Sequence, residues 1–152
     1  MSIIDLFSRK VIGYAMVDHL RAELVVSALR MALARGRKIV GDIWLHSDRG
    51  VQFSSEMFRD VLNVIGIGQS TSRKGDCWDN APCENWFGKL KSEWIYPHGI
   101  YVMREEAKSP IIESIEMFYP SERVHQSLDY RTPNEFESEY FDVERELTTV
   151  LR

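Results

Sequence analysis

The chain has 152 residues, of which 44% are hydrophobic and 28% are charged, and its formal net charge is −4 at pH 7. This length and composition are typical of one folded domain with a sizeable core, and they exclude an intrinsically disordered chain. No apolar run approaches the roughly 20 residues that span a bilayer, and the first residues lack a secretory signal. We therefore expect a cytoplasmic protein without membrane contact.

The charge is distributed unevenly along the chain. Residues 1–98 carry 13 Lys/Arg against 11 Asp/Glu, a net of +2, whereas residues 99–152 carry 6 against 12, a net of −6. A nucleic-acid surface therefore fits the first two thirds better than the acidic remainder, and we expect weak DNA binding because so few basic residues are in excess. The two cysteines, Cys77 and Cys83, lack the spacing of a zinc site, and we interpret them as reduced thiols.

Short apolar runs and one amphipathic segment occupy the first 36 residues. Residues 3–7 and 11–17 predict two strands joined by a turn at residues 8–10. Residues 22–34 repeat apolar side chains at i, i+4 and i+8, which predicts a helix ended by Gly36.

The middle of the chain continues with a strand, a helix and a strand. Residues 42–46 predict a strand that delivers Asp48 to its C-terminal end, and residues 67–70 predict a fourth strand. Between them, Ser54, Ser55 and Glu56 open a helix. Its expected buried face consists of Met57, Phe58, Val61, Leu62 and Ile65. Residues 73–80 are polar and predict a loop over the site.

The next predicted helix starts near Pro82 and ends near residue 96. Helical spacing places Glu84 and Lys91 on one edge, while the packing face consists of Cys83, Phe87, Leu90 and Trp94. Residues 101–118 predict another helix, interrupted at Pro110, and the acidic tail beyond residue 134 is expected to be partly helical. This order of elements predicts an α/β fold.

Asp48 and Glu84 are the candidate site residues, separated by 35 residues and each placed beside a turn. Two carboxylates on different elements are ligands that a hard divalent cation needs to act on a phosphate. Simpler roles exist for both. Asp48 can accept turn N–H bonds, and Glu84 can favour the N-terminus of its helix through the helix dipole.

Three stretches carry a resemblance to a known family. They are His46-Ser47-Asp48-Arg49-Gly50-Val51-Gln52-Phe53, the segment 72–93 around Asp79-Asn80-Ala81-Pro82-Cys83-Glu84-Asn85, and the segment 119–128 with Tyr130 and Thr132-Pro133. In order and spacing they resemble the motifs of DDE-type insertion-sequence transposases, whose catalytic core is shared with retroviral integrases. The resemblance covers about residues 3–136.

The resemblance implies a ribonuclease H-like mixed sheet flanked by helices, with a C-terminal helical extension. Residues 2–98 would form a partial catalytic core, residues 99–137 its helical part and residues 138–152 an acidic tail. Asp5 matches the family's turn after the second strand, not the first catalytic Asp. We therefore expect this chain to lack the first, central strand and its acid.

By the same resemblance, Asp48 and Glu84 are catalytic residues and ligands of Mg²⁺ or Mn²⁺, held weakly because the third acid is absent. The implied chemistry is two-metal phosphoryl transfer, namely DNA hydrolysis followed by strand transfer, without a covalent protein intermediate. Lys91 is the first candidate for DNA contact, against the alternative of a solvated helix lysine. The weaker DNA-binding candidates are Arg73, Lys74 and Lys89.

Several other residues have two interpretations. Trp78 and Trp86 can stack on bases, although core packing is favoured for Trp86. Arg123 and His125 belong to the third motif, and we interpret them as structural braces. His46 either orients the loop beside it or packs internally. Asp76 and Asp79 fit turn roles better than metal ligation.

Three hypotheses for the whole chain follow. The first is a transposase core segment, acting on transposon ends and target DNA and inactive alone without its first Asp. The second is a non-catalytic remnant that binds DNA or a full-length transposase, or self-associates, and interferes with transposition. The third, an independent ribonuclease H-like nuclease, is disfavoured because the Arg123 and His125 segment resembles transposases.

Overall fold

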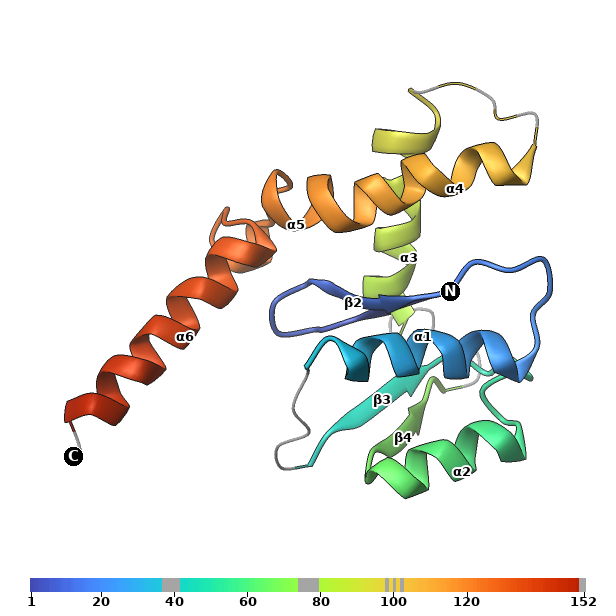
Figure 1. Cartoon of the computed structure of the whole chain (residues 1–152), viewed down its shortest axis with the longest axis horizontal. Helices are drawn as coiled ribbons and strands as arrows, with labels where there is room; N and C mark the ends of the chain where they lie inside the picture. The colour runs from blue at the N-terminus through green and yellow to red at the C-terminus, as the bar shows by residue number, and fades with distance from the viewer. Residues whose placement is uncertain (37–41, 74–79, 98, 100, 102, 151–152) are drawn as a thin grey trace. The chain divides into compact units, whose positions relative to one another are not determined.

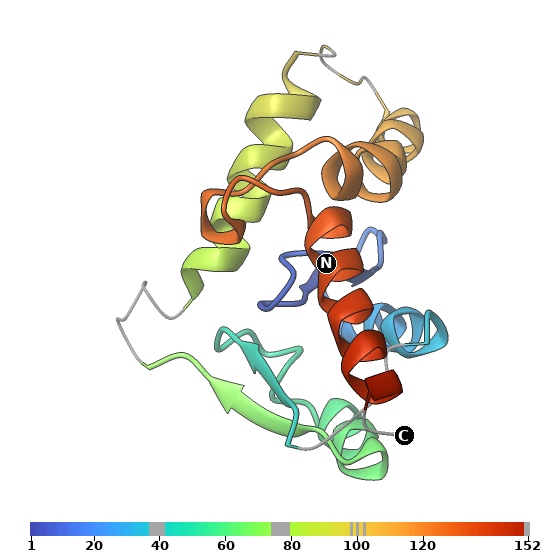
Figure 2. The ribbon, with the colours of Figure 1, turned by 90° about the vertical axis from the view of Figure 1, so that its left-hand side faces the viewer.

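The computed structural model describes residues 1–36, 42–73, 80–97, 99, 101 and 103–150, with side chains as far as residue 142 (Figures 1 and 2). The chain divides into two compact units. The first unit contains Met1–Ile4 and Ile12–Phe87, and the second contains Asp5–Val11 and residues 88–152. Each unit has its own packing and is described by itself.

Four short strands belong chiefly to the first unit, at Ser2–Ile4 (β1), Val11–Tyr14 (β2), Trp44–Ser47 (β3) and Gly68–Thr71 (β4). All four confirm predicted strands, with bounds that differ by up to three residues. β1 pairs with β2, and β3 runs parallel to β4, with the two lying side by side in Figure 2. A parallel pair needs a crossover, which the helix between β3 and β4 provides.

The resemblance implies a mixed sheet that lacks its central strand, and the described strands are not joined into one sheet. They make two separate two-stranded sheets instead. Apolar periodicity locates a strand but carries no information about which distant edge it pairs with, so the strands were predictable and their association into one sheet was not.

Two helices cover the first unit's core, α1 (Ala22–Ala34) and α2 (Glu56–Ile65). α1 has the predicted bounds. At the start of α2 the Ser55 Oγ accepts a hydrogen bond from the Phe58 amide at 3.3 Å, and Gly66 ends the helix with a φ of 74°. The polar cap is the helix start that the sequence predicts, and the left-handed glycine is a common helix end.

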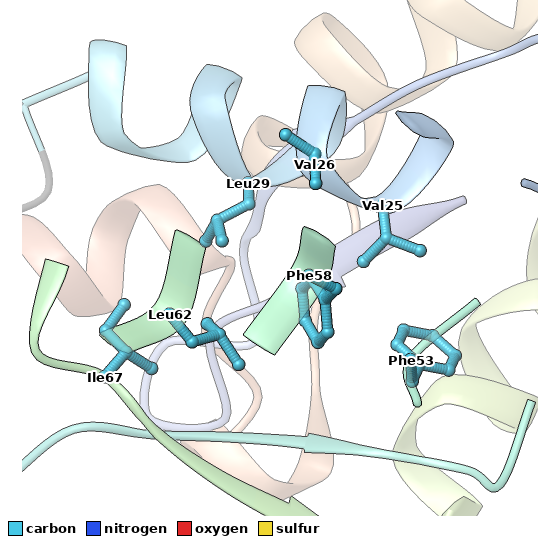
Figure 3. Close-up of a cluster of buried hydrophobic side chains, with 7 residues drawn as sticks. All are labelled: Val25, Val26, Leu29, Phe53, Phe58, Leu62 and Ile67. Carbon is cyan, nitrogen blue, oxygen red and sulfur yellow. The ribbon is translucent and has the colours of Figure 1, made fainter. Parts of the chain in front are cut away.

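The core of the first unit lies between α1 and α2. Figure 3 shows Val25, Val26 and Leu29 of α1 facing Phe58 and Leu62 of α2, and the rings of Phe53 and Phe58 meet edge to face at 5.9 Å. Burying such a side chain contributes about 1.5–3 kcal/mol. The prediction that Met57 belongs to this face is wrong. Its side chain is 48% exposed, since it lies about 100° around the helix from Phe58.

Gly13 allows β2 to lie directly against α1. A Cβ at this position would come within 2.2 Å of the Ala28 carbonyl oxygen and 3.0 Å of the Ala32 Cβ. No other residue fits without moving the helix or the strand, so Gly13 fixes how closely these two elements approach.

The second unit is almost entirely helical. α3 (Ala81–Lys89) begins in the first unit and continues as the π-helix η2 (Leu90–Ile95). The chain then forms α4 (Arg104–Glu113), the π-helix η3 (Ser114–Phe118), α5 (Tyr119–Ser121), the 3₁₀ turn η4 (Gln126–Leu128) and α6 (Pro133–Val150). α6 confirms the helical tail. No described helix is long and apolar enough to cross a membrane.

The helix does not start anew at Pro110, because Pro110 lies inside α4. A proline there removes one N–H donor, whose acceptor in a regular helix is the carbonyl four residues earlier, at Glu106. Glu106 is exposed, so water can replace the missing donor.

Contacts between distant segments hold the second unit together. The rings of Trp94 and Phe118 lie 5.0 Å apart, and Phe7 lies edge to face with Phe136 at 5.0 Å. Lys10 Nζ pairs with Glu137 at 2.9 Å. The turn between β1 and β2 therefore packs on α6 within this unit.

Candidate functional site

Asp48 lies immediately after β3, where the strand ends in a turn. Its Oδ1 accepts a hydrogen bond from the Gly50 amide at 2.8 Å, which closes the local turn that Asp side chains favour. The residue is exposed. The two roles considered for Asp48 are therefore compatible, because one carboxylate oxygen holds the turn while the carboxylate stays accessible to a ligand.

Ser72, just beyond β4, fixes the backbone on both sides of Asp48. Its amide and its Oγ both donate to the Ser47 carbonyl, at 3.0 and 3.2 Å. Its own carbonyl accepts from Arg49 Nε at 2.9 Å. Ser47 and Ser72 are buried, so these bonds form away from competing water and hold the end of β3 to the end of β4.

His46 braces the same two strands through both ring nitrogens. Nδ1 lies 3.0 Å from Ser70 Oγ, and Nε2 lies 3.1 Å from Ser72 Oγ. In each contact the ring nitrogen donates or accepts according to the tautomer, because a neutral imidazole has one donor and one acceptor. His46 thus supports the strand that carries Asp48.

Glu84 lies in the first turn of α3, with Pro82 in the same turn as predicted. Proline suits this position, because the first amides of a helix have no partner within it. Glu84 is exposed, and its negative charge is favoured by the helix dipole. The sequence therefore places this carboxylate at an accessible helix start.

The pKa of the Cys83 thiol is affected by both carboxylates. Burial raises the pKa of its thiol above the ordinary value of 9.0, and the negative charges of Asp48 and then Glu84 raise it further. Asp48, Cys83 and Glu84 all belong to the first unit. The fold therefore brings both predicted site residues within electrostatic reach of one thiol.

The predicted DNA-binding residues fare differently. Arg73 and Lys91 are exposed, as a role in DNA contact requires. Lys89 Nζ is 3.2 Å from Glu93 on its own helix, so part of its charge is already neutralised. Lys74 lies outside the described residues.

Of the other predictions for residues 76–86, the structure tests the one for Trp86. Trp86 is only 4% exposed, which confirms its packing role. Asp76, Cys77, Trp78 and Asp79 fall outside the part of the chain that the structure describes.

A cavity of about 320 Å³ adjoins Asp48, and sequence reasoning missed its two basic residues, Arg49 and Arg59. The remaining lining is Asp48, Gly50, Phe53, Ser54, Gln69 and Thr71. Arg49 stands within the Asp48 motif, and Arg59 lies in the helix directly after it. Helical periodicity predicts that Arg59 is an ordinary solvated residue. Only the fold shows that it lines this cavity.

The third motif forms a separate structural cluster in the second unit. Arg123 binds Glu93 through Nε at 2.8 Å and Nη2 at 3.2 Å, and this hydrogen bonding lowers the pKa of Glu93. The His125 ring packs edge to face on Tyr119 at 5.2 Å, and Tyr119 Oη donates to the Arg9 carbonyl at 2.9 Å. These contacts support the expected bracing role of Arg123 and His125.

Burial dominates the titration of this cluster. It lowers the pKa of His125 to about 4, with the positive charges of Arg123 and Arg9 acting in the same direction. Burial likewise raises the pKa of Tyr119 to about 12. Both groups are therefore neutral at pH 7, which suits packing.

Asp5 also has the expected turn role. Its Oδ1 accepts from the Phe7 amide at 3.1 Å, and its Oδ2 accepts from Ser8 Oγ at 2.9 Å. Both carboxylate oxygens are thereby used within the turn between β1 and β2.

Comparisons with known proteins agree with the motif resemblance. Two family models, each described as an integrase core domain, match residues 1–77 and 65–133. The chain is 36% identical over 134 residues to the transposase for insertion sequence element IS904 of Lactococcus lactis, covering 88% of this chain and 52% of that protein.

Two further relatives are similar. An uncharacterized 31 kDa protein of insertion element IS600 from Shigella sonnei is 40% identical over 136 residues, or 90% of this chain and 49% of that protein. The transposase InsF for insertion sequence IS3fB from Escherichia coli is 36% identical over 137 residues, or 90% of this chain and 47% of that protein. The chain thus spans about half the length of these curated relatives.

Proposed function

This chain belongs to the integrase core domain family, and from that premise we propose that it is a catalytic core segment of an insertion-sequence transposase. Its proposed reaction is phosphoryl transfer on DNA, namely strand cleavage followed by strand transfer. The placement of Asp48 at the end of β3 and of Glu84 in the first turn of α3 carries the proposal. Both residues are exposed.

The two carboxylates suit a hard divalent cation. Mg²⁺ is bound in proteins by one or two carboxylates, with water and substrate phosphate oxygens completing its shell. With Asp48 and Glu84 as its protein ligands the cation keeps most of its water shell, so we propose that binding in this segment is weak. When bound, Mg²⁺ or Mn²⁺ would supply Lewis-acid stabilisation of the phosphate oxygens.

The proposed roles of the protein groups are binding and positioning. Asp48 and Glu84 would hold the cation beside the reacting phosphate, and Arg73 would contact a neighbouring phosphate. Lys91, in the second unit, is a further candidate for DNA contact. Water or a 3′-hydroxyl attacks phosphorus in line, a new P–O bond forms, and the bond to the leaving oxygen breaks. No protein nucleophile is required, so Cys83 has no covalent role in this scheme.

The proposed complete fold is ribonuclease H-like, with a central strand between β1 and β3. The division of the strands into two two-stranded sheets supports this proposal, because β1 and β3 would each keep one edge for that strand. The central strand would also carry the third carboxylate. As these 152 residues stand, we propose that they are inactive alone.

A non-catalytic role is the second candidate. The separation of the described strands into two sheets favours a segment that binds DNA or a full-length transposase and interferes with transposition. Self-association through the free strand edges belongs to the same proposal. In either role we place the protein in the cytoplasm with the bacterial nucleoid, because DNA is its partner.

A fusion experiment separates the two roles. The part of the IS904 transposase that precedes the matched region is joined to Met1, and DNA cleavage and strand transfer are measured in Mg²⁺ and Mn²⁺. We expect activity that both Asp48→Asn and Glu84→Gln abolish, with circular dichroism showing that the variants fold. A folded fusion that binds DNA but never cleaves it would contradict the catalytic role and favour the interfering one.

A further inference from the structure

The cavity beside Asp48 has a composition that suits an anion. Two arginines, Arg49 and Arg59, line it together with a single acidic residue, Asp48. The hydroxyls of Ser54 and Thr71 and the amide of Gln69 complete its polar wall, and the buried Phe53 contributes an apolar surface. Two guanidinium groups against one carboxylate leave an excess of positive charge.

Arg49 is held in place but keeps donors for a ligand. Its Nε donates to the Ser72 carbonyl at 2.9 Å, which anchors the guanidinium at the ends of β3 and β4. Among the described residues no carboxylate pairs with it, so its terminal nitrogens are open to an incoming acceptor. An anchored guanidinium loses less freedom on binding than a mobile one.

Arg59 lies in the first turn of α2, where the helix dipole disfavours a positive charge. It is exposed, and no described residue forms an ion pair or hydrogen bond with its side chain. Neither helix stability nor an internal contact therefore accounts for an arginine at this position. Its guanidinium is therefore available to a ligand in the cavity.

The chemistry of the lining identifies a phosphate group. An arginine guanidinium can donate two parallel hydrogen bonds to two oxygens of one phosphate, and hydroxyl and amide groups add single hydrogen bonds. A volume of about 320 Å³ is at the lower end for ligand sites, which suits one nucleotide unit. The charged lining residues are all exposed, so a continuous strand can enter and leave.

We propose that this cavity binds one phosphodiester of a DNA strand through Arg49 and Arg59, next to the group that reacts at Asp48. The assignment rests on the proposed function, and it adds a DNA-binding subsite on the β3–α2 side of Asp48. The role of Arg59 is to position the strand.

The first test uses the whole chain and a short fluorescently labelled single DNA strand, titrated at several salt concentrations. Arg59→Gln should weaken binding by roughly 5–10-fold and reduce the slope of log K against log salt by about 0.7, the value for one phosphate contact on a single strand. Arg30→Gln is the matched control, because Arg30 is an exposed arginine on α1 that does not line the cavity. It should change neither quantity.

The outcomes separate the cavity from the proposed function. If the wild-type chain binds the strand and Arg59→Gln behaves like Arg30→Gln, the cavity assignment is overturned while DNA binding stands. If the wild-type chain binds no DNA at any salt concentration, both the cavity assignment and the proposed function are contradicted.

A second test distinguishes a DNA strand from a free nucleotide. Side-chain Nε–H signals of the arginines are followed by NMR during titration with a thymidine dinucleoside phosphodiester, thymidine monophosphate or inorganic phosphate. The proposal predicts that the phosphodiester shifts the Arg49 and Arg59 signals and leaves the Arg30 signal unchanged. Equal or larger shifts with the monophosphate or with inorganic phosphate would overturn the DNA assignment.

Discussion

Charged groups are used in opposite ways in the two units of this protein. Around Asp48 in the first unit, Asp48, Arg49 and Arg59 are exposed and none of them forms an ion pair with another described residue. In the second unit, Arg123 is engaged by Glu93 through two nitrogens, and Lys10 pairs with Glu137. A charged side chain outside an ion pair loses no hydration free energy while it stays exposed, and it can bind a ligand. A charged side chain in an ion pair contributes to the stability of the fold.

The largest expected effect lies in the paired region, at His125. Because its folded pKa of about 4 is below the ordinary 6.5, the unfolded chain takes up a proton first as pH falls. Stability is then complete above pH 6.5 and declines as the pH falls toward 4. We expect a loss of about 2 kcal/mol, since partial solvation reduces the effect. Urea unfolding at several pH values measures this loss. His125→Phe should flatten the profile, and an unchanged profile would contradict the burial of a neutral ring.

Arg123→Ala should destabilise the chain by about 1–2 kcal/mol, because it removes two charge-assisted hydrogen bonds to Glu93. The pKa of Glu93 is lowered, so this contribution is present above its ordinary 4.5 and is lost as pH falls below it. Lys108→Ala is the control, since it breaks an exposed ion pair with Glu105 and should cost under about 0.5 kcal/mol. Equal losses in urea unfolding would remove the distinction between the two pairs.

Substitutions at the candidate site should barely affect folding. Asn at position 48 can still accept the Gly50 hydrogen bond, so Asp48→Asn should change stability by less than about 0.5 kcal/mol. Glu84→Gln loses only a favourable charge at a helix start, about 0.5 kcal/mol. Thermal unfolding measures both. A loss of several kcal/mol would make these carboxylates structural and end the contrast between the two regions.

The smallest expected effect is at Cys83. The negative charges of Asp48 and Glu84 add to burial in raising its pKa, so Asp48→Asn and Glu84→Gln should each lower that pKa. Alkylation at a fixed pH should then be faster, and more so for Asp48→Asn. The measurement is made with Cys77→Ser in every variant, and Glu23→Gln on α1 is the control. Rates equal to the control would show that the two carboxylates do not share one electrostatic environment.

Local elements were predictable because their causes are local. Periodic apolar residues and Gly36 define α1, and Ser55 with Gly66 defines α2. The motif around Asp48 likewise predicted an acid at a strand end, and the family comparison agrees with that motif.

Features that depend on tertiary context were not predictable. No residue pattern predicts the π-helix Leu90–Ile95. The rule that proline interrupts a helix fails at Pro110, because Glu106 is exposed and water can bind its carbonyl. The division into two sheets depends on which strand edges meet. Arg59 belongs to the candidate site only because the fold brings it to the same cavity as Asp48, which spacing along the chain cannot show.

The central claim is that Asp48 and Glu84 together hold one divalent cation. Mn²⁺ binding, followed by electron paramagnetic resonance or calorimetry, tests it most directly in the wild type, Asp48→Asn, Glu84→Gln and the double variant. We predict binding weaker than micromolar. Each single variant and the double variant should lose it to the same extent, because the effects of substituting two ligands of one cation are not additive. Micromolar or tighter binding, or a single variant that keeps wild-type binding, would contradict the account.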